Sequence, residues 1–170
     1  LEQALTVPVL LERDINLLAM GEWSHGAARG AAATFGMFVG TGVGACYLEG
    51  GTPFRGATGS AVELGHVPIR GEGRRCVCGN RDCLEAYACG HVLHDFARTY
   101  DRPVEGLFAD AADAPEGLRT ALDEFVRDLA FALATAVNLF QPEVALVGGG
   151  VPALRGFPRE RFATTFYDHL

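Results

Sequence analysis

Residues 63–85 read ELGHVPIRGEGRRCVCGNRDCLE and contain three of the five cysteines in the chain. Their spacing is His66-x9-Cys76-x-Cys78-x4-Cys83. Three thiolates and one imidazole make the closed four-ligand set that zinc takes in structural sites, with no position left open for water. Three unrelated core thiols are the alternative, but buried free cysteines do not usually gather in a polar loop. We therefore expect a structural zinc ion bound by His66, Cys76, Cys78 and Cys83.

The composition and net charge of the chain argue against two classes of binding partner. The 170 residues are 49% hydrophobic and 21% charged, with a net charge of -7. A negative balance argues against a nucleic-acid surface, which needs a basic patch. No apolar run approaches the ~20 residues needed to cross a bilayer. We expect no nucleic-acid or membrane partner for this segment.

The first residues of the chain bear on where the protein is located and on where the chain begins. Residues 1–11 lack the basic start and the small-residue cleavage site of a signal peptide, so we expect a cytoplasmic protein. Because residue 1 is Leu, we also expect the chain to begin inside a longer protein or after a processing event.

Strand and helix patterns alternate along the chain, which indicates an α/β class. We expect a short buried strand at Thr6–Glu12, followed by a helix to about Trp23. Thr34–Val39 and Gly44–Leu48 are expected to pair around a glycine turn. The clearest helix is Pro115–Phe140, whose apolar residues follow a helical period. The remaining expected elements are a strand at Val144–Val147 and helices at Leu84–Cys89, His91–Tyr100 and Pro158–His169.

Four ordered motifs resemble those of the ROK family (repressors, open reading frames and kinases). Glu63–His66 followed by Cys76–Glu85 resembles the family signature E-[IL]-G-H…C-x-C-G-x-x-G-C-x-E. Gly40–Gly44 resembles its second phosphate loop, and Gly148–Gly150 resembles its adenosine-side glycine motif. Arg13–Asn16 falls where the family places its catalytic Asp. Either glycine run alone is a weak signal, but the ordered set is specific and covers nearly the whole chain.

The resemblance implies an actin-like ATPase fold of the ribonuclease H-like type, present here incompletely. Residues 1–28 would be the end of the first lobe, with the catalytic Asp and a hinge. Residues 29–170 would be the incomplete second lobe with the zinc-binding loop. The family's D-x-G-x-T phosphate loop does not occur before Asp14, and its last nucleotide-side segment should follow residue 170. We therefore expect this chain alone to lack kinase activity.

The activity that the resemblance implies is transfer of a phosphoryl group from ATP, with Mg, to a hexose hydroxyl. A sugar hydroxyl needs a carboxylate to accept its proton, and the family match makes Asp14 that general base. From the residues alone, a helix N-cap is the favoured interpretation of Asp14. The other contacts that the family supplies fall on Asn16, Glu63, His66 and Glu85 for the sugar, and on Gly40, Thr41, Gly42, Gly44, Gly148, Gly149 and Gly150 for the nucleotide.

These contacts have plainer alternatives. Asn16 would serve equally well as a helix cap, and the two glycine runs as ordinary turns. Glu63 and Glu85 would be surface acids, which is the usual place of Glu. His25, His91, His94 and His169 fit no constellation and are interpreted as solvated or packing residues.

Three departures from the family pattern bear on specificity. Typical glucokinases carry Asn directly before the catalytic Asp, and this chain has Arg13. Asn both donates and accepts hydrogen bonds, whereas Arg only donates, which argues against plain glucose as the substrate. Arg13–Asn16, Cys76–Asn80 and the segment from Gly148 to Glu160 most resemble the D-allose kinases of the family, and this resemblance implies D-allose or a glucose-like sugar. Val62 stands where Gly is usual and is expected to shift the Glu63 loop. Asp82 also replaces a Gly, and its charge beside a thiolate is expected to weaken the metal site slightly.

The same domain occurs in ROK repressors, where it senses a sugar beside an upstream DNA-binding helix-turn-helix. A sugar-sensing effector domain is therefore the alternative to the kinase, and a zinc-stapled scaffold without chemistry is a third hypothesis. For either functional class we expect a hexose ligand. Exposed sheet edges favour association with another copy, so we also expect a homodimer or a higher homo-oligomer.

Overall fold

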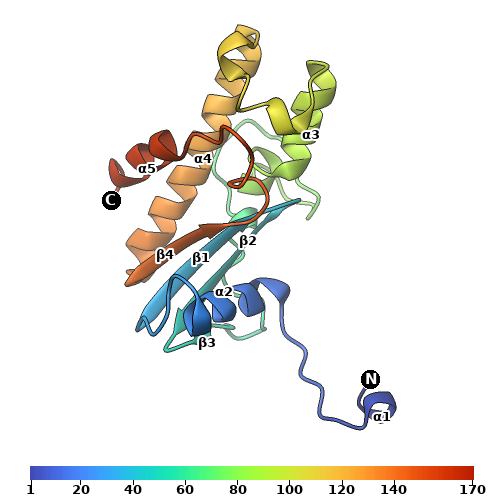
Figure 1. Cartoon of the computed structure of the whole chain (residues 1–170), viewed down its shortest axis with the longest axis vertical. Helices are drawn as coiled ribbons and strands as arrows, with labels where there is room; N and C mark the ends of the chain where they lie inside the picture. The colour runs from blue at the N-terminus through green and yellow to red at the C-terminus, as the bar shows by residue number, and fades with distance from the viewer.

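The computed structural model describes residues 1–170 and contains one sheet of four strands in the order β3-β2-β1-β4 (Figure 1). The strands β1 (Ala33–Val39) and β2 (Val43–Glu49) form an antiparallel hairpin. A second tight turn leads into the two-residue strand β3 (Thr52–Pro53), which pairs with β2. The predicted strand pair is confirmed.

The fourth strand, β4 (Val144–Gly148), returns to the sheet after a long helical connection and pairs parallel with β1. It lies at the edge of the sheet, and its outer side has no strand partner. Its residues alternate between half-buried and exposed, so β4 is the least covered of the longer strands. The predicted strand at Val144–Val147 is confirmed.

Three helices gather on one side of the sheet: α3 (Gly90–Thr99), α4 (Glu116–Phe140) and α5 (Arg159–Tyr167). The longest, α4, presents an apolar stripe to β1, and α5 packs against α4. Helix α4 ends where Gln141 adopts a left-handed conformation, and Pro142 cannot continue a helix. The fully buried large side chains on the stripe are Leu118, Phe125, Val126, Leu129 and Leu133.

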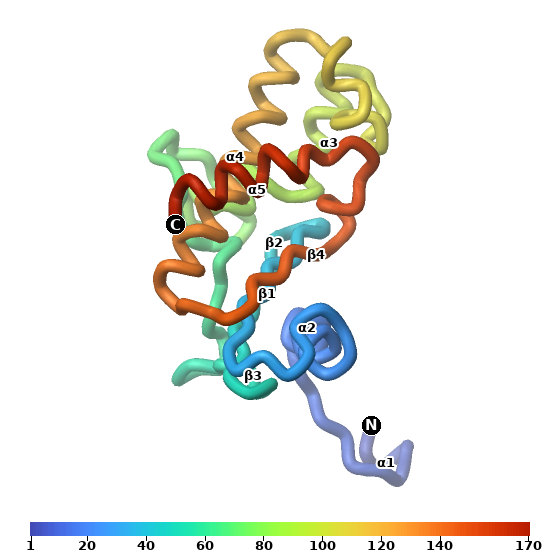
Figure 2. The backbone as a smooth tube through the Cα atoms, turned by 60° about the vertical axis from the view of Figure 1, so that its left-hand side comes forward, coloured from blue at the N-terminus to red at the C-terminus, as the bar shows by residue number.

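The opposite side of the sheet is covered by the single helix α2 (Asp14–His25), as Figure 2 shows. Successive strand residues point to opposite faces, so the hairpin serves both sides. Cys46 and Leu48 of β2 pack with Ala19 of α2 in a small second core. The predicted helix to about Trp23 is confirmed, and its first residue is Asp14.

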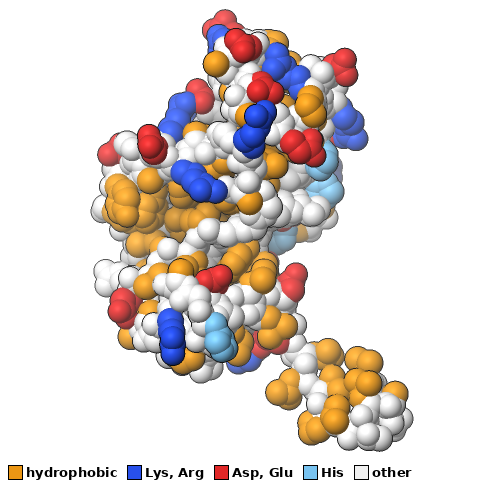
Figure 3. Space-filling view, viewed as in Figure 1, with side chains coloured by type: hydrophobic (Ala, Val, Ile, Leu, Met, Phe, Trp, Pro, Cys, Tyr) orange, Lys and Arg blue, Asp and Glu red, His pale blue; other side chains and the backbone are white.

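Two of the predicted secondary-structure elements are wrong. Thr6–Glu12 is not a strand: a short helix, α1 (Glu2–Leu5), is followed by an extended segment that no strand pairs with. Leu10 and Leu11 are 95% and 88% exposed, and apolar side chains gather on this segment in Figure 3. An apolar run becomes a strand only when another backbone satisfies its amides and carbonyls.

The expected helix at Leu84–Cys89 is also wrong, because only Leu84–Ala86 form a single 3-10 turn. Packing overrides helical propensity here, since Leu84 and Ala88 lie in the core and Tyr87 is buried as well. Cys89 lies at the N-cap position of α3 rather than inside a helix. No helix in the structure combines the length and the apolar character that a membrane crossing requires.

The stripe on α4 makes a direct stability prediction. Leu129 is fully buried, so Leu129→Ala should lower the free energy of unfolding by ~2–5 kcal/mol through lost burial and a residual cavity. Leu139 on the same helix is 74% exposed, and Leu139→Ala should change it by less than about 0.5 kcal/mol. Equilibrium urea unfolding measures both. Equal losses in the two variants would contradict the assignment of this stripe to the core.

Candidate functional site

The tight turn between β1 and β2 meets two other backbone segments. The Gly90 amide, at the start of α3, donates to the Gly40 carbonyl at 2.8 Å. The Val151 amide, just after β4, donates to the Val39 carbonyl at 3.0 Å. These bonds bring the two glycine runs, Gly40–Gly44 and Gly148–Gly150, to the same end of the sheet.

A cavity of about 580 Å³ opens at this end of the sheet. Gly40 and Thr41 of the first run and Gly150 of the second line it. The other glycines of the two runs, Gly42, Gly44, Gly148 and Gly149, do not. The apolar part of its lining is made by Leu93, Val104, Val151 and Leu154.

His91 and His94 also line this cavity, although no motif in the sequence grouped them with a site. Both lie in the first turns of α3, directly after Gly90. Residues three apart share a face of a helix, and that spacing is the signal that would have paired them. What the sequence lacks is the information that this face meets the glycine turn.

The N-terminus of α2 carries Asp14 with an exposed carboxylate. Its Oδ1 accepts one hydrogen bond, from the amide of Ile15 at 2.8 Å. The N-cap position belongs to Arg13 and makes no side-chain cap bond, so the N-cap interpretation of Asp14 is wrong. The Asp14 carboxylate makes no other hydrogen bond and no ion pair within the chain.

The neighbouring Arg13 reaches across to the loop before the cysteines. Its Nη2 lies 2.7 Å from Glu63 Oε1, and its Nη1 donates to the Ala61 carbonyl at 2.9 Å. One oxygen of the Glu63 carboxylate is therefore committed to Arg13. This ion pair ties α2 to the loop that leads toward His66.

Asn16 is 4% exposed, and its Nδ2 donates to Glu12 Oε1 at 2.7 Å rather than capping the helix. Glu12 also accepts from the Arg13 amide at 2.9 Å and pairs with Arg55. These bonds, led by that of the Arg13 amide, lower the pKa of Glu12 to about 2. Sequence reasoning missed Glu12, because the expected strand assigned it to a strand end and Arg55 lies far along the chain.

Glu85 and the His66 loop both contact the first residue of β2. Glu85 Oε2 accepts from the Val43 amide at 2.8 Å. Gly65 packs so closely on the Val43 carbonyl that a Cβ would lie 2.2 Å from its oxygen, which no other residue tolerates. On the other side, Ile15 of α2 occupies the space where a Cβ on Gly44 would stand. The first residue of β2 is thus in contact with Glu85 and with Gly65, the neighbour of His66. The next residue, Gly44, is in contact with Ile15, the neighbour of Asp14.

The four predicted metal ligands converge. The ligand atoms of His66, Cys76, Cys78 and Cys83 all lie within 4.8 Å of one another. His66 Nδ1 is 3.7 Å from Cys76 Sγ, and Cys78 Sγ is 3.7 Å from Cys83 Sγ. Zinc–sulfur bonds of about 2.3 Å place tetrahedral sulfur atoms roughly 3.8 Å apart, so the set fits a zinc ion.

Without a cation these thiols differ in acidity. Burial raises the pKa of the Cys83 thiol to about 12, whereas a backbone amide hydrogen bond at Asn80 lowers the pKa of Cys78. Metal binding requires the thiolate forms, so it must displace the proton of Cys83. Because His66 directs Nδ1 at the cluster, its Nε2 is left for another partner.

The backbone is left-handed at both positions where the family pattern usually has Gly. Val62 and Asp82 adopt left-handed conformations, with φ of 65° and 61°. A β-branched residue is rare there, and the strain at Val62 costs about 1–2 kcal/mol. The Asp82 carboxylate accepts from the amides of Gly73 and Arg74 at 3.0 and 2.9 Å. The Tyr87 hydroxyl donates to it as well, and these donors lower the pKa of Asp82, so the negative charge is kept and the expected weakening of the metal site stays a prediction.

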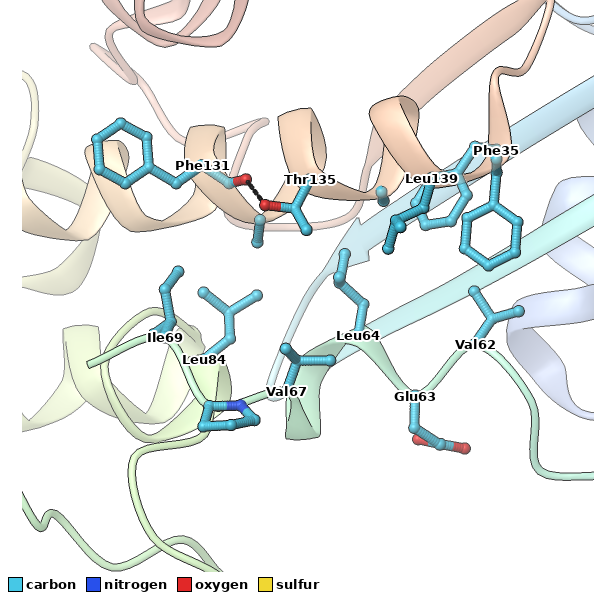
Figure 4. Close-up of a pocket in the computed structure, with 14 residues that line it drawn as sticks. Phe35, Val62, Glu63, Leu64, Val67, Ile69, Leu84, Phe131, Thr135 and Leu139 are labelled. Carbon is cyan, nitrogen blue, oxygen red and sulfur yellow. Dashed lines mark hydrogen bonds between the residues drawn. The ribbon is translucent and has the colours of Figure 1, made fainter. Parts of the chain in front are cut away.

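A second cavity, of about 380 Å³, lies between α4 and residues 62–69 and is mainly apolar. Glu63 is the one titratable side chain in its lining. Figure 4 shows the Glu63 carboxylate pointing away from this cavity, while Leu64 and Leu139 project into it. The polar residues of the candidate site therefore lie outside it.

Comparison with known proteins places this arrangement among sugar kinases and regulators. A family model described as ROK family matches residues 1–170. A glucokinase of Thermotoga maritima is 35% identical over 160 residues, covering 84% of this chain and 50% of that protein. A xylose repressor of Bacillus spizizenii is 29% identical over 178 residues, covering 100% of this chain and 46% of the repressor. The chain spans about half the length of these relatives.

Solved structures agree in fold. A ROK hexokinase from Thermus thermophilus matches with a TM-score of 0.89 at 33% identity, covering 99% of this chain and 60% of that one. A ROK family glucokinase from Streptomyces griseus, in complex with glucose and AMPPNP, matches with a TM-score of 0.82 at 28% identity, covering 99% and 61%. The expected actin-like ATPase fold, present in part, is confirmed.

The ligand geometry predicts one zinc ion per chain when the protein is purified without chelators. Cys83→Ser should remove the zinc, because a three-ligand remnant binds it far more weakly. Cys46→Ala, at a buried cysteine outside the cluster, should retain it. Inductively coupled plasma mass spectrometry gives the stoichiometry. A wild-type protein free of zinc, or equal zinc in both variants, would refute the assignment.

Proposed function

Because this chain belongs to the ROK family, we propose that it carries the sugar-binding and part of the nucleotide-binding machinery of an ATP-dependent hexose kinase. The observation that carries the proposal is the arrangement around Val43. The exposed Asp14, the acids Glu63 and Glu85, and the glycine turn all belong to segments packed at this strand end.

In this proposal Asp14 is the general base. A hexose hydroxyl gives its proton to the Asp14 carboxylate as its oxygen attacks the γ-phosphorus of ATP, and ADP leaves. Little in the protein competes for that carboxylate, because its one bond is to the amide of Ile15. Glu12 is less suited to the task, since its hydrogen bonds hold its pKa at about 2 and engage both oxygens.

The hexose lies, in this proposal, between Glu63, His66 and Glu85, with Asn16 behind them. Each acid keeps one carboxylate oxygen for sugar hydroxyls, and hydrogen bonds to carboxylates are stronger than neutral ones. His66 Nε2 is free to donate. A zinc ion bound by His66 and the three cysteines would hold the loop and fix the orientation of this imidazole. Asn16 acts through its bond to Glu12, which anchors the start of α2.

The nucleotide is assigned to the cavity lined by Gly40, Thr41 and Gly150. Its apolar lining suits a purine, and glycine backbone amides approach phosphate oxygens without interference from Cβ atoms. Gly42, Gly44, Gly148 and Gly149 shape the two turns rather than line the cavity. Magnesium would arrive with the ATP phosphates, as is usual for this ion.

D-allose or a glucose-like hexose is the proposed substrate, and Arg13 is the reason. It stands where typical family glucokinases have an Asn, and it engages both Glu63 and the Ala61 carbonyl. A guanidinium offers the sugar only donors. A hydroxyl of any epimer can accept from it, so Arg13 would select among hexoses through the position of its donors.

From the family resemblance we propose residues 1–28 as the end of the first lobe and residues 29–170 as the second, with α2 of the first part packed directly on β1 and β2 of the second. In-line transfer requires two lobes that close on the nucleotide and exclude water. This chain spans about half of its kinase relatives, so the transfer is proposed for the whole protein and not for residues 1–170 alone. Association through the free edge of β4 stays a prediction.

A sugar-sensing domain is the second candidate, because a xylose repressor matches the full length of this chain. A sensor needs the sugar contacts but not a proton acceptor beside the nucleotide turn. The exposed Asp14 carboxylate and the glycine-lined cavity favour the kinase. The two candidates separate on catalysis, since a sensor binds a hexose without consuming ATP.

The kinase proposal predicts the effect of Asp14→Asn in the full-length protein. Loss of the proton acceptor should lower kcat by about 10²–10⁴-fold while the hexose and ATP still bind, because the amide keeps the size of the carboxylate. A coupled ADP-release assay gives kcat, and calorimetry gives the two affinities. Glu116→Gln, at an exposed acid that begins α4, is the matched control and should leave kcat and both affinities unchanged. Near-normal turnover of Asp14→Asn would rule out Asp14 as the base.

A further inference from the structure

An acid lies in the buried face of the longest helix. Asp128 is 2% exposed and sits on α4 between Phe125 and Leu129 of the core stripe. A buried carboxylate is tolerated only when it is paired and hydrogen-bonded. Arg70 supplies that partner, with Nε and Nη2 at 2.7 and 2.5 Å from Asp128 Oδ2. Arg70 belongs to the segment that runs from His66 toward the cysteines.

The same guanidinium lies over an aromatic ring. The Arg70 Cζ is 4.7 Å from the centroid of Tyr87, and the Arg74 Cζ is 5.4 Å from it. Tyr87 is 5% exposed, and cation–π contacts strengthen when water is excluded. The Tyr87 ring is therefore in contact with two arginines, one of which is fixed to α4 through Asp128.

The Tyr87 hydroxyl continues the contact toward the metal ligands. It donates to Asp82 Oδ1 at 2.5 Å. Asp82 precedes the ligand Cys83, and its carbonyl accepts from the Ile69 amide at 2.9 Å, next to Arg70. Tyr87 itself lies two residues after Glu85. An unbroken series of contacts thus runs from α4 through Arg70 and Tyr87 to the cysteine loop.

We propose that Arg70 and Tyr87 are positioning residues that lock the Cys3His cluster and Glu85 onto α4, and so set both zinc affinity and hexose affinity. The zinc part stands on the cluster geometry, and only the hexose part rests on the proposed function. Neither residue lines the cavity assigned to the nucleotide. Loosening the series should therefore act on zinc and hexose and spare ATP.

The test uses Tyr87→Phe in the full-length protein, because this change keeps the ring and removes only the hydrogen bond to Asp82. Outer-shell partners typically change metal affinity by 10–100-fold, so the zinc Kd should rise by about that factor. The KM for hexose should rise while the KM for ATP stays constant. Competition with a zinc-binding dye and steady-state kinetics provide the two readouts. Tyr167→Phe, at a tyrosine 69% exposed, is the matched control and should leave the zinc Kd and both KM values unchanged.

A second variant separates positioning from general stability. Arg70→Leu combined with Asp128→Leu replaces the buried ion pair by apolar side chains, a change that often preserves or raises stability. It should keep the unfolding midpoint yet bind zinc more weakly. Unchanged zinc affinity in Tyr87→Phe and in this double variant would overturn the proposal, as would equal rises in the hexose and ATP KM values. A protein without kinase activity but with weakened zinc in Tyr87→Phe would reject the kinase and keep the zinc part.

Discussion

The backbone of Val43 is the point on which the candidate site depends. Its amide is committed to Glu85, and its carbonyl is in contact with Gly65, where no side chain fits. The sheet fixes Val43 itself, because it opens β2 directly opposite Val39 of β1. The segment from Glu63 to Glu85, whose helical parts are the 3-10 turns Leu64–His66 and Leu84–Ala86, is thus held at both ends by one residue of the hairpin, which places its acids at defined positions.

The acidic side chains of the chain differ in how many hydrogen bonds and ion pairs they make. Glu12 and Asp128 are saturated by arginines and amides, whereas Asp14 keeps its carboxylate exposed with a single backbone bond. Hydrogen bonds hold the pKa of Glu12 at about 2, which makes it a poor proton acceptor, and Asp128 is 2% exposed and paired with Arg70. The fold therefore leaves the Asp14 carboxylate available for the proposed proton transfer, whereas Glu63 and Glu85 each have one oxygen engaged within the chain.

Local patterns in the sequence predicted much of this arrangement. The glycine hairpin, the period of α4 and the spacing of the three cysteines each depend on neighbouring residues, and the structure bears them out. Contacts between distant residues were not predictable. Glu12 meets Arg55 across 43 positions and Arg70 meets Asp128 across 58, so no local pattern connects them. The false strand at Thr6–Glu12 has the same cause, because a strand requires a partner that the segment itself does not encode.

The central claim is that this half-length segment serves phosphoryl transfer and not sensing alone. ADP release by the full-length protein, measured with ATP and Mg in the presence and absence of D-allose or D-glucose, tests it most directly. The account predicts ADP formation that depends on hexose and matches sugar phosphate formation one to one. Hexose binding by calorimetry with no ADP above the hexose-free rate would contradict it and identify a sensor.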